Sequence, residues 1–254
     1  MSFNLRFVVI GLGLLLSYGS LLAQDKPWYV PQHVELRGGV RWLYQDVHDP
    51  NGVLVDLWSP ISGASLTLVG HAQGRLRGLV GLSYQALYIG HDLHDQYPPG
   101  GGSSGLGAMW MGHLGVGLDL VRRRGFRLPL TVALGLRRGT LTVGPSGVSS
   151  QVVPLDTASG VLVIEQRDEV LRRWQPTLHV GIGAEVQLWA TRVWLVANLG
   201  TTLGLGGPLA RADIQYLESG ASAPRSGRAE TFGHQLEASL GLRVDLFRAP
   251  DVQP

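Results

Sequence analysis

The stretch 114–136 reads LGVGLDLVRRRGFRLPLTVALGL and contains two runs in which apolar residues alternate with glycine, polar or charged residues. Three arginines and a glycine, at 122–125, stand between the two runs. Alternation with a period of two residues places all the apolar side chains on one face of a strand. The stretch therefore predicts two antiparallel strands joined by a tight turn, each with one apolar face.

The same alternation recurs along most of the chain. In each run, aliphatic side chains share one face and oppose glycine, polar or charged residues on the other. Alternation repeated this often predicts an all-β fold made of eight antiparallel strands. We expect these strands at residues 33–44, 64–71, 75–90, 106–120, 126–142, 174–189, 193–205 and 234–247.

The connections between these strands are alternately short and long. The short ones are expected at 72–75, 122–125 and 190–191, and the long polar ones at 45–63, 92–105, 143–173 and 206–231. A membrane barrel sorts its connections in this way, with short turns in the periplasm and long loops outside. The segment 143–173 includes two strand-like runs that could form a hairpin above the membrane. The second and fourth long connections contain segments that are flexible by composition, HDQYPPGGGSSG at 94–105 and ESGASAPRSGR at 218–228.

Each apolar row holds five or six large aliphatic residues, which is enough to cross an apolar band of ~25 Å. In a membrane barrel the apolar rows face lipid, so the opposite rows face the lumen. Because an eight-stranded barrel is only wide enough for side chains to fill it, the charged inward residues are expected to form a polar plug. These residues are Glu35, Arg37, Arg41, Arg77, Asp119, Arg127, Arg137, Glu185, Glu237, Arg243 and Asp245.

Aromatic residues gather at the strand ends, as expected for belts at the two membrane interfaces. The belt near the long loops is expected to contain Trp42, Tyr44, Tyr84, Tyr88, Trp110 and Trp174, and the belt near the short turns Phe126, Trp189, Trp194 and Phe247. Pro129 cannot donate a ladder hydrogen bond, which predicts a local bulge. The arginines at 122–124 either meet anionic lipid headgroups or form a simple solvated turn.

The N-terminus has the layout of a secretory signal peptide over residues 1–23, with one arginine, an apolar core and a small residue at Ala23. The barrel domain is then expected over 24–254, with its strands within about 33–247. The chain has 254 residues, a net charge of +2 and no cysteine. No disulfide can therefore stabilise it, and the small net charge does not favour nucleic acid as a partner.

The predicted layout resembles the small eight-stranded outer-membrane β-barrels of the OmpA/OmpX type and those common in Bacteroidota. The last strand is similar to the C-terminal signal that the barrel-assembly machinery reads, with Ser239, Gly241, Val244 and Leu246 at the matching places. The chain departs from that pattern by continuing for seven residues after Phe247. The resemblance implies a transmembrane, up-and-down barrel in the outer membrane of a Gram-negative-type bacterium, in contact with outer-membrane lipid.

No cofactor or metal site is expected. The segment 91–95, HDLHD, could hold a cation through imidazole and carboxylate groups, but a solvated polar loop is the more ordinary interpretation. His71, His113 and His179 fall on lumen rows, where we expect them to be part of the plug. The lipid-facing rows show no arrangement of nucleophile and base, which argues against a lipid-modifying enzyme.

We therefore expect a non-enzymatic barrel that acts through its long surface loops, by binding a partner or surface polymer, or as a subunit of an envelope complex. Two alternatives have different consequences. A narrow channel would require the arginine and glutamate plug to part. A soluble lipocalin-like barrel would turn its apolar rows inward to line a pocket.

Overall fold

The computed structural model describes residues 31–70, 75–94, 103–141, 148–155, 160–171, 174–188 and 192–246. The expected signal peptide lies outside these residues, as do His71, Asp95, Trp189 and Phe247. The described chain consists of strands and their connections. Within it, no helix has the length and apolar character needed to cross a membrane.

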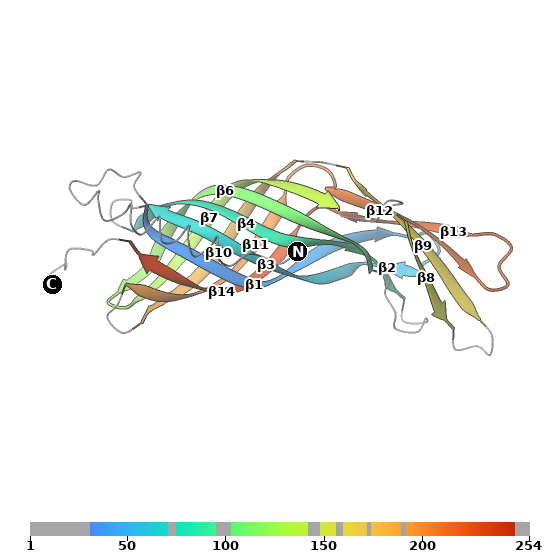
Figure 1. Cartoon of the computed structure of the whole chain (residues 1–254), viewed down its shortest axis with the longest axis horizontal. Coiled ribbons are helices and arrows are strands. Elements are labelled where there is room, and N and C mark those ends of the chain that lie inside the picture. Colours follow the sequence, from blue (N-terminus) through green and yellow to red (C-terminus); the bar gives the residue numbers. More distant parts are fainter. Residues whose placement is uncertain are drawn as a thin grey trace, which may run out of the picture.

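Eight strands form a closed antiparallel barrel, as the sequence predicts (Figure 1). Each strand pairs with the next barrel strand along the chain, and the last pairs with the first from His33↔Asp245 to Leu43↔Gln235. Closure leaves the barrel without a free edge. The strands are β1 (Pro31–His48), β3 (Leu57–Gly70), β4 (Leu76–Gly90), β6 (Ser103–Arg123), β7 (Phe126–Leu141), β10 (Gln175–Gln187), β11 (Val193–Gly204) and β14 (Gln235–Asp245).

The barrel turns its apolar rows outward. Leu114, Leu134 and Leu240 are more than 60% exposed, at 66%, 63% and 62%, whereas Arg137 and Arg243 on the opposite rows are fully buried. Such an exterior is stable only where lipid replaces water. The barrel is therefore transmembrane, and the alternative of a soluble barrel with an apolar pocket is wrong.

Four further strands extend the barrel wall above the membrane (Figure 1). They are β8 (Val148–Pro154), β9 (Val161–Val170), β12 (Ala210–Glu218) and β13 (Arg225–Thr231), and they lie in the order β1-β13-β12-β9-β8. The last three residues of β1, from Asp46 to His48, pair with β13. The suggested hairpin within 143–173 is thus present, as β8 and β9. We call these four strands the extracellular sheet.

The expectation that 206–231 is a long polar loop is wrong, because it contains the hairpin of β12 and β13. The segment 218–228, expected to be flexible, includes the turn of this hairpin and the start of β13. In β12, buried Ala210, Ala212 and Ile214 alternate with more exposed polar residues. These small and aliphatic residues pack in an apolar core beneath the extracellular sheet. The buried members of that core are Val53, Leu54, Ile89, Leu93, Val153, Leu162, Ile164, Ala210, Ala212, Ile214, Tyr216 and Ala229.

The expected loop 45–63 is also largely strand, since β1 continues to His48 and β3 begins at Leu57. Asp49 organises the short connection that remains. Its Oδ2 accepts backbone hydrogen bonds from Val53 (2.8 Å) and Leu54 (3.0 Å), and its Oδ1 accepts one from the Tyr216 hydroxyl at 2.9 Å. Burial and this bond to Asp49 raise the pKa of Tyr216 to about 12. Asp49 thereby ties the connection to the extracellular sheet.

Within this connection, β2 (Leu54–Val55) pairs with β5 (Asp92–Leu93). At the opposite end of the barrel, the arginine turn is as tight as the sequence predicts, with Gly125 in the left-handed region at φ 74°. The predicted irregularity at Pro129 is present, since the register of β6 and β7 shifts between Asp119 and Val121, next to Pro129. The other two short connections lie mostly outside the described residues.

Candidate functional site

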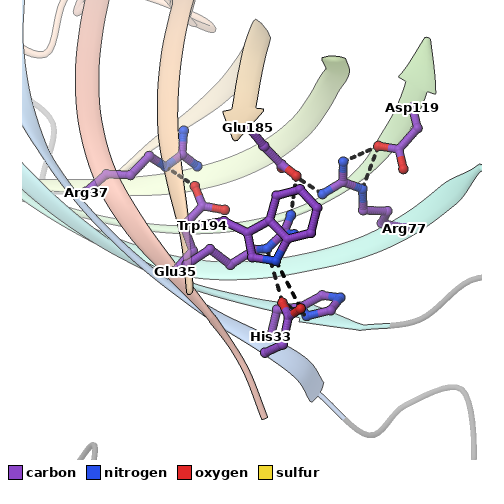
Figure 2. A network of polar contacts seen from close by, with 9 residues as sticks. His33, Glu35, Arg37, Arg77, Asp119, Glu185 and Trp194 are labelled. Carbon is purple, nitrogen blue, oxygen red and sulfur yellow. Dashed lines mark hydrogen bonds and ion pairs between the residues drawn. The ribbon is translucent and has the colours of Figure 1, made fainter. Parts of the chain in front are cut away.

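The lower half of the lumen is filled by a network of buried ion pairs. Arg77 donates to Asp119 through Nε at 2.8 Å and to Glu185 through Nη1 at 2.8 Å (Figure 2). Arg243, from the far side of the barrel, bonds the second carboxylate oxygen of Glu185. Glu185 is 2% exposed and lies between two guanidinium groups. It therefore connects β4, β10 and β14 through a single side chain.

The indole of Trp194 is part of this network. Its Nε1 donates to Asp245 at 3.0 Å, and the ring lies under the guanidinium groups of Arg127 and Arg243, whose Cζ atoms are 4.7 and 4.5 Å from the ring centroid. Asp245 also contacts His33 Nδ1 at 2.7 Å. The assignment of Trp194 to an interfacial belt is wrong, because it is 3% exposed and lies on the inward row of β11.

Arg37 contacts Glu35 at 2.5 Å beside this first network (Figure 2). A second polar layer lies above it, where Arg41 donates to Glu237 at 2.9 Å. Arg137 has no carboxylate partner among the described residues; its Nη2 donates instead to Gln175 Oε1 and to the carbonyl oxygen of Gly233, both at 2.9 Å. The neutral acceptors hold this buried cation at the upper end of the lumen.

Little space remains between these side chains. Two small cavities, of about 20 and 30 Å³, lie among the polar residues of the lumen. The larger is lined by His113 and His179 together with Arg41 and Glu237. A cavity of this size holds about one or two water molecules.

The outer mouth of the barrel is closed by an apolar collar, which consists of Leu43, Ile61, Leu87, Met109 and Leu209. The first four members come from barrel strands, and Leu209 comes from the connection between β11 and β12. Leu209 is fully buried, and its backbone N–H donates to the carbonyl oxygen of Thr231 at 2.7 Å. The collar therefore includes the base of the extracellular sheet.

Gln175 fastens two extracellular connections over the mouth. Its Nε2 donates to the carbonyl oxygens of Gly207 (3.2 Å) and Phe232 (3.0 Å), while its Oε1 accepts the bond from Arg137. Gly233, next to Phe232, has φ 70°, and a Cβ there would lie 2.2 Å from the Arg137 guanidinium. A larger residue at 233 would therefore displace the Arg137 side chain.

The first histidine of the HDLHD segment, His91, faces the protein interior. His91 is 1% exposed, and its Nδ1 donates to Gln166 Oε1 at 3.2 Å, whereas His94 is exposed. The amide of Gln166 donates to the Ile89 carbonyl at 3.3 Å, so this pair joins β9 to the end of β4. In the described chain, no three His, Asp or Glu side chains gather as metal ligands.

Acid should weaken the attachment of the extracellular sheet at His91. Burial lowers the pKa of His91 below its ordinary 6.5, and the bond to Gln166 and the charge of Asp92 oppose this only in part. The neutral ring is then favoured in the folded chain, and Nε2 has no hydrogen-bond partner for a second proton. The contribution of His91 to stability is full above pH 6.5 and is lost as the pH falls below it.

We therefore expect proteolysis of the hairpin β12–β13 to accelerate as the pH falls from about 7 to about 5. A protease active over this range, with cleavage followed on gels, measures the effect. The variant His91→Leu removes the titrating group and should flatten the profile. If His91→Leu keeps the acid sensitivity of the wild type, another group is responsible.

Most of the sequence-predicted plug residues are buried in the lumen, and Arg37, Arg127 and Asp245 are half-buried there. Of the predicted belt residues, Trp42, Tyr84, Trp110, Trp174 and Phe126 are exposed on the outside and Tyr44 is half-buried. The side chain of Tyr88 lies outside the described part of the structure, as do the residues Trp189 and Phe247. In β14, Ser239 faces the lumen.

Three residues of this region were not singled out by the sequence pattern. Gln175 lies at the end of a predicted strand, and Leu209 lies in an expected loop. At such positions the alternation does not indicate which way a side chain points. Arg138 follows Arg137 directly, and two adjacent charges must face opposite sides of a strand. The two adjacent arginines could therefore have predicted that one of them faces lipid.

No model of a known protein family matches the chain, and no curated protein matches it. Among solved structures, neisserial surface protein A is 12% identical, with 84% of this chain and 96% of that chain covered and a TM-score of 0.41. OprG from Pseudomonas aeruginosa is 10% identical, covering 86% and 97%, with a TM-score of 0.45. A major outer membrane protein from Thermus thermophilus is 14% identical, covering 83% and 98%, with a TM-score of 0.42.

Proposed function

We propose that this outer-membrane β-barrel is a closed, non-enzymatic support for its extracellular sheet, and that the sheet binds an extended segment of a partner protein. The observation that carries the proposal is the way the sheet is built. It is hydrogen-bonded to the barrel wall through β1 and β13, has its own apolar core, and inserts Leu209 into the mouth. Rigid elements position a binding surface more precisely than loops do.

The contents of the lumen favour binding over conduction. The ion pairs of Glu185 cross the lumen from β10 to β4 and β14. Arg41 and Glu237 form a second buried pair between the neighbouring strands β1 and β14, and the apolar collar lies above both. A narrow channel would have to separate these buried charges, and breaking a buried pair costs about 3–5 kcal/mol. The barrel therefore serves as a membrane anchor, and the extracellular sheet is the part that binds the partner.

The edge strand β8 is the place where a partner would bind. Among the described residues, no strand pairs with its second side. Leu155 donates its backbone N–H to Gly160, on the β9 side, at 2.8 Å. Because alternate residues of an antiparallel strand point their backbone groups to the same side, Ser150, Val152 and Pro154 face the open side. A proline is tolerated at such an edge, since its missing N–H costs no ladder bond.

The side chains at this edge suit an apolar strand. Val152 is 61% exposed and pairs with Val163 on β9, which pairs with Leu217 on β12, itself 40% exposed. The segment 148–154 has no charged residue, although edge strands usually carry charges that prevent pairing. A partner strand would gain main-chain hydrogen bonds from the edge and specificity from this apolar row.

Replacing Val152 with proline should abolish strand binding without unfolding the sheet, because it removes an open-side N–H and leaves the β9 ladder intact. A suitable probe is a fluorescent peptide with the sequence of β9, VLVIEQRDEV, which β8 already pairs with inside the chain. Fluorescence anisotropy with the full chain in micelles should show binding weakened at least tenfold by Val152→Pro.

Val152→Thr keeps the N–H and a β-branched side chain, and it should bind the peptide nearly as well as the wild type. A peptide that binds wild type and Val152→Pro equally occupies some other site. If the wild type binds no strand at all, the extracellular sheet does not have the proposed role.

A further inference from the structure

The outward row of β7 contains one charged side chain. From Phe126 to Thr140, the outward positions of this strand carry phenylalanine, leucine, valine and threonine, and only Arg138 is charged. Arg138 is exposed, and it lies near the end of β7 that leads to the extracellular side. Because an arginine on a lipid-facing wall is tolerated near an interface and not at the midplane, its level corresponds to the headgroups of the outer leaflet.

Tryptophans flank this arginine on both neighbouring strands. Trp110 of β6 is its register partner, and Trp174 directly precedes Gln175, the partner of Arg137. The Cζ atom of Arg138 lies 5.6 Å from the centroid of the Trp174 ring. Trp110 and Trp174 are 43% and 55% exposed on the outside of the barrel. On the far side of Trp110, Tyr84 packs against it with a centroid distance of 4.7 Å.

Arg138 has no acidic partner among the described residues. None of their ion pairs includes it, whereas Arg41, Arg77 and Arg243 in the lumen each pair with a carboxylate. The guanidinium group of Arg138 is planar and presents paired donors that match a phosphate. At 5.6 Å from the Trp174 ring centroid, the guanidinium group is within the range of a cation–π contact, which uses none of its N–H donors.

We propose that Trp110, Arg138 and Trp174 form a binding site for the phosphate of a lipid headgroup in the outer leaflet. The guanidinium group binds the phosphate, and the two indole rings lie at the boundary between headgroups and acyl chains, where amphipathic rings are stable. The site requires only the barrel wall. It is therefore independent of the function proposed for the extracellular sheet.

Native mass spectrometry can test the site. The full chain in micelles is incubated with dipalmitoyl phosphatidic acid or with dipalmitoylglycerol, and the lipid that stays bound to the protein is measured. The two lipids share their acyl chains and differ in the phosphate. We expect the wild type to retain the phosphate-bearing lipid about tenfold better, and Arg138→Gln to lose this preference. Arg138→Lys keeps the charge but not the planar donors, and should give an intermediate result.

Arg228→Gln is the matched control, because it removes an exposed arginine of the extracellular sheet, paired with Asp213 at 3.3 Å, far from lipid. Boiled and unboiled gel samples show whether each variant has folded into a closed barrel. Equal retention of the two lipids by the wild type, or an unchanged preference in folded Arg138→Gln, would overturn the proposal.

Competition with inorganic phosphate identifies the source of the anion. If millimolar phosphate displaces the lipid from the wild type in an Arg138-dependent way, the site recognises phosphate itself, whether free or on a lipid. If the lipid stays bound, the acyl chains contribute and the lipid is the ligand. Each result supports a phosphate site at Arg138.

Discussion

The variant Glu185→Gln is expected to destabilise the barrel by about 3–5 kcal/mol, the usual cost of leaving a buried charge without its partner. Glutamine has the shape of glutamate but cannot neutralise Arg77 and Arg243, which both bond Glu185. Arg77 would keep Asp119, whereas fully buried Arg243 would keep only Asp245, with Nε 3.5 Å from the carboxylate. The loss should therefore fall mainly on the contact between β10 and β14.

The temperature at which the folded band disappears from unboiled gels measures this effect. Glu169→Gln is the matched control, because Glu169 pairs with Arg211 at 3.4 Å on the exposed face of the extracellular sheet. Exposed pairs contribute about 0–1 kcal/mol, so this control should unfold close to the wild-type temperature. A Glu185→Gln barrel as resistant as the control would show that the lumen network does not stabilise the fold.

The variant Leu209→Ala should release the extracellular sheet from the barrel mouth while the barrel stays closed. Leu209 is fully buried in the collar, and truncating such a leucine costs about 2–5 kcal/mol. The cost falls on the connection that leads into β12, since the other collar residues belong to barrel strands. Limited proteolysis should then cut the hairpin β12–β13 many times faster, without loss of the heat-dependent gel shift of the barrel.

Leu217→Ala provides the comparison, because the same truncation at a 40% exposed position should change the cleavage rate little. Equal cleavage rates for the two variants would mean that the collar does not hold the sheet. Planar-bilayer recordings add a second test of closure. The wild type and Leu209→Ala should both stay silent, because the ion pairs below the collar are intact. A steady wild-type conductance would contradict the proposal of a closed barrel.

The eight barrel strands and the direction of their faces were predictable because the pattern that specifies them is local. Alternation fixes which side chains share a face, and the size of the apolar rows shows that this face meets lipid. The same rule could have placed Trp194 correctly. Trp194 has the same parity as Asn198 and Thr202, which are buried in the lumen, although its position at a strand end suggested a belt residue.

The extracellular sheet was harder to recognise. The hairpin β8–β9 is rich in β-branched residues and was suggested by its sequence, whereas β12 and β13 contain many charged and small residues. These strands are stable because β13 pairs with β1 and β12 pairs with β9. Such partners come from distant parts of the chain, and a sequence window does not contain them.

The closed transmembrane barrel, its inward charges and its outward apolar rows could all be derived from the amino-acid sequence, since each follows from a two-residue period in a chain segment of known length. Which of the inward charges meet depends on the tertiary structure. Glu185 lies 108 residues from Arg77 and 58 from Arg243, and the three converge because the barrel closes in one register. The same closure brings Leu209 into the mouth and sets Arg138 between two tryptophans on neighbouring strands. Contacts across strands depend on register and closure, which no local pattern encodes.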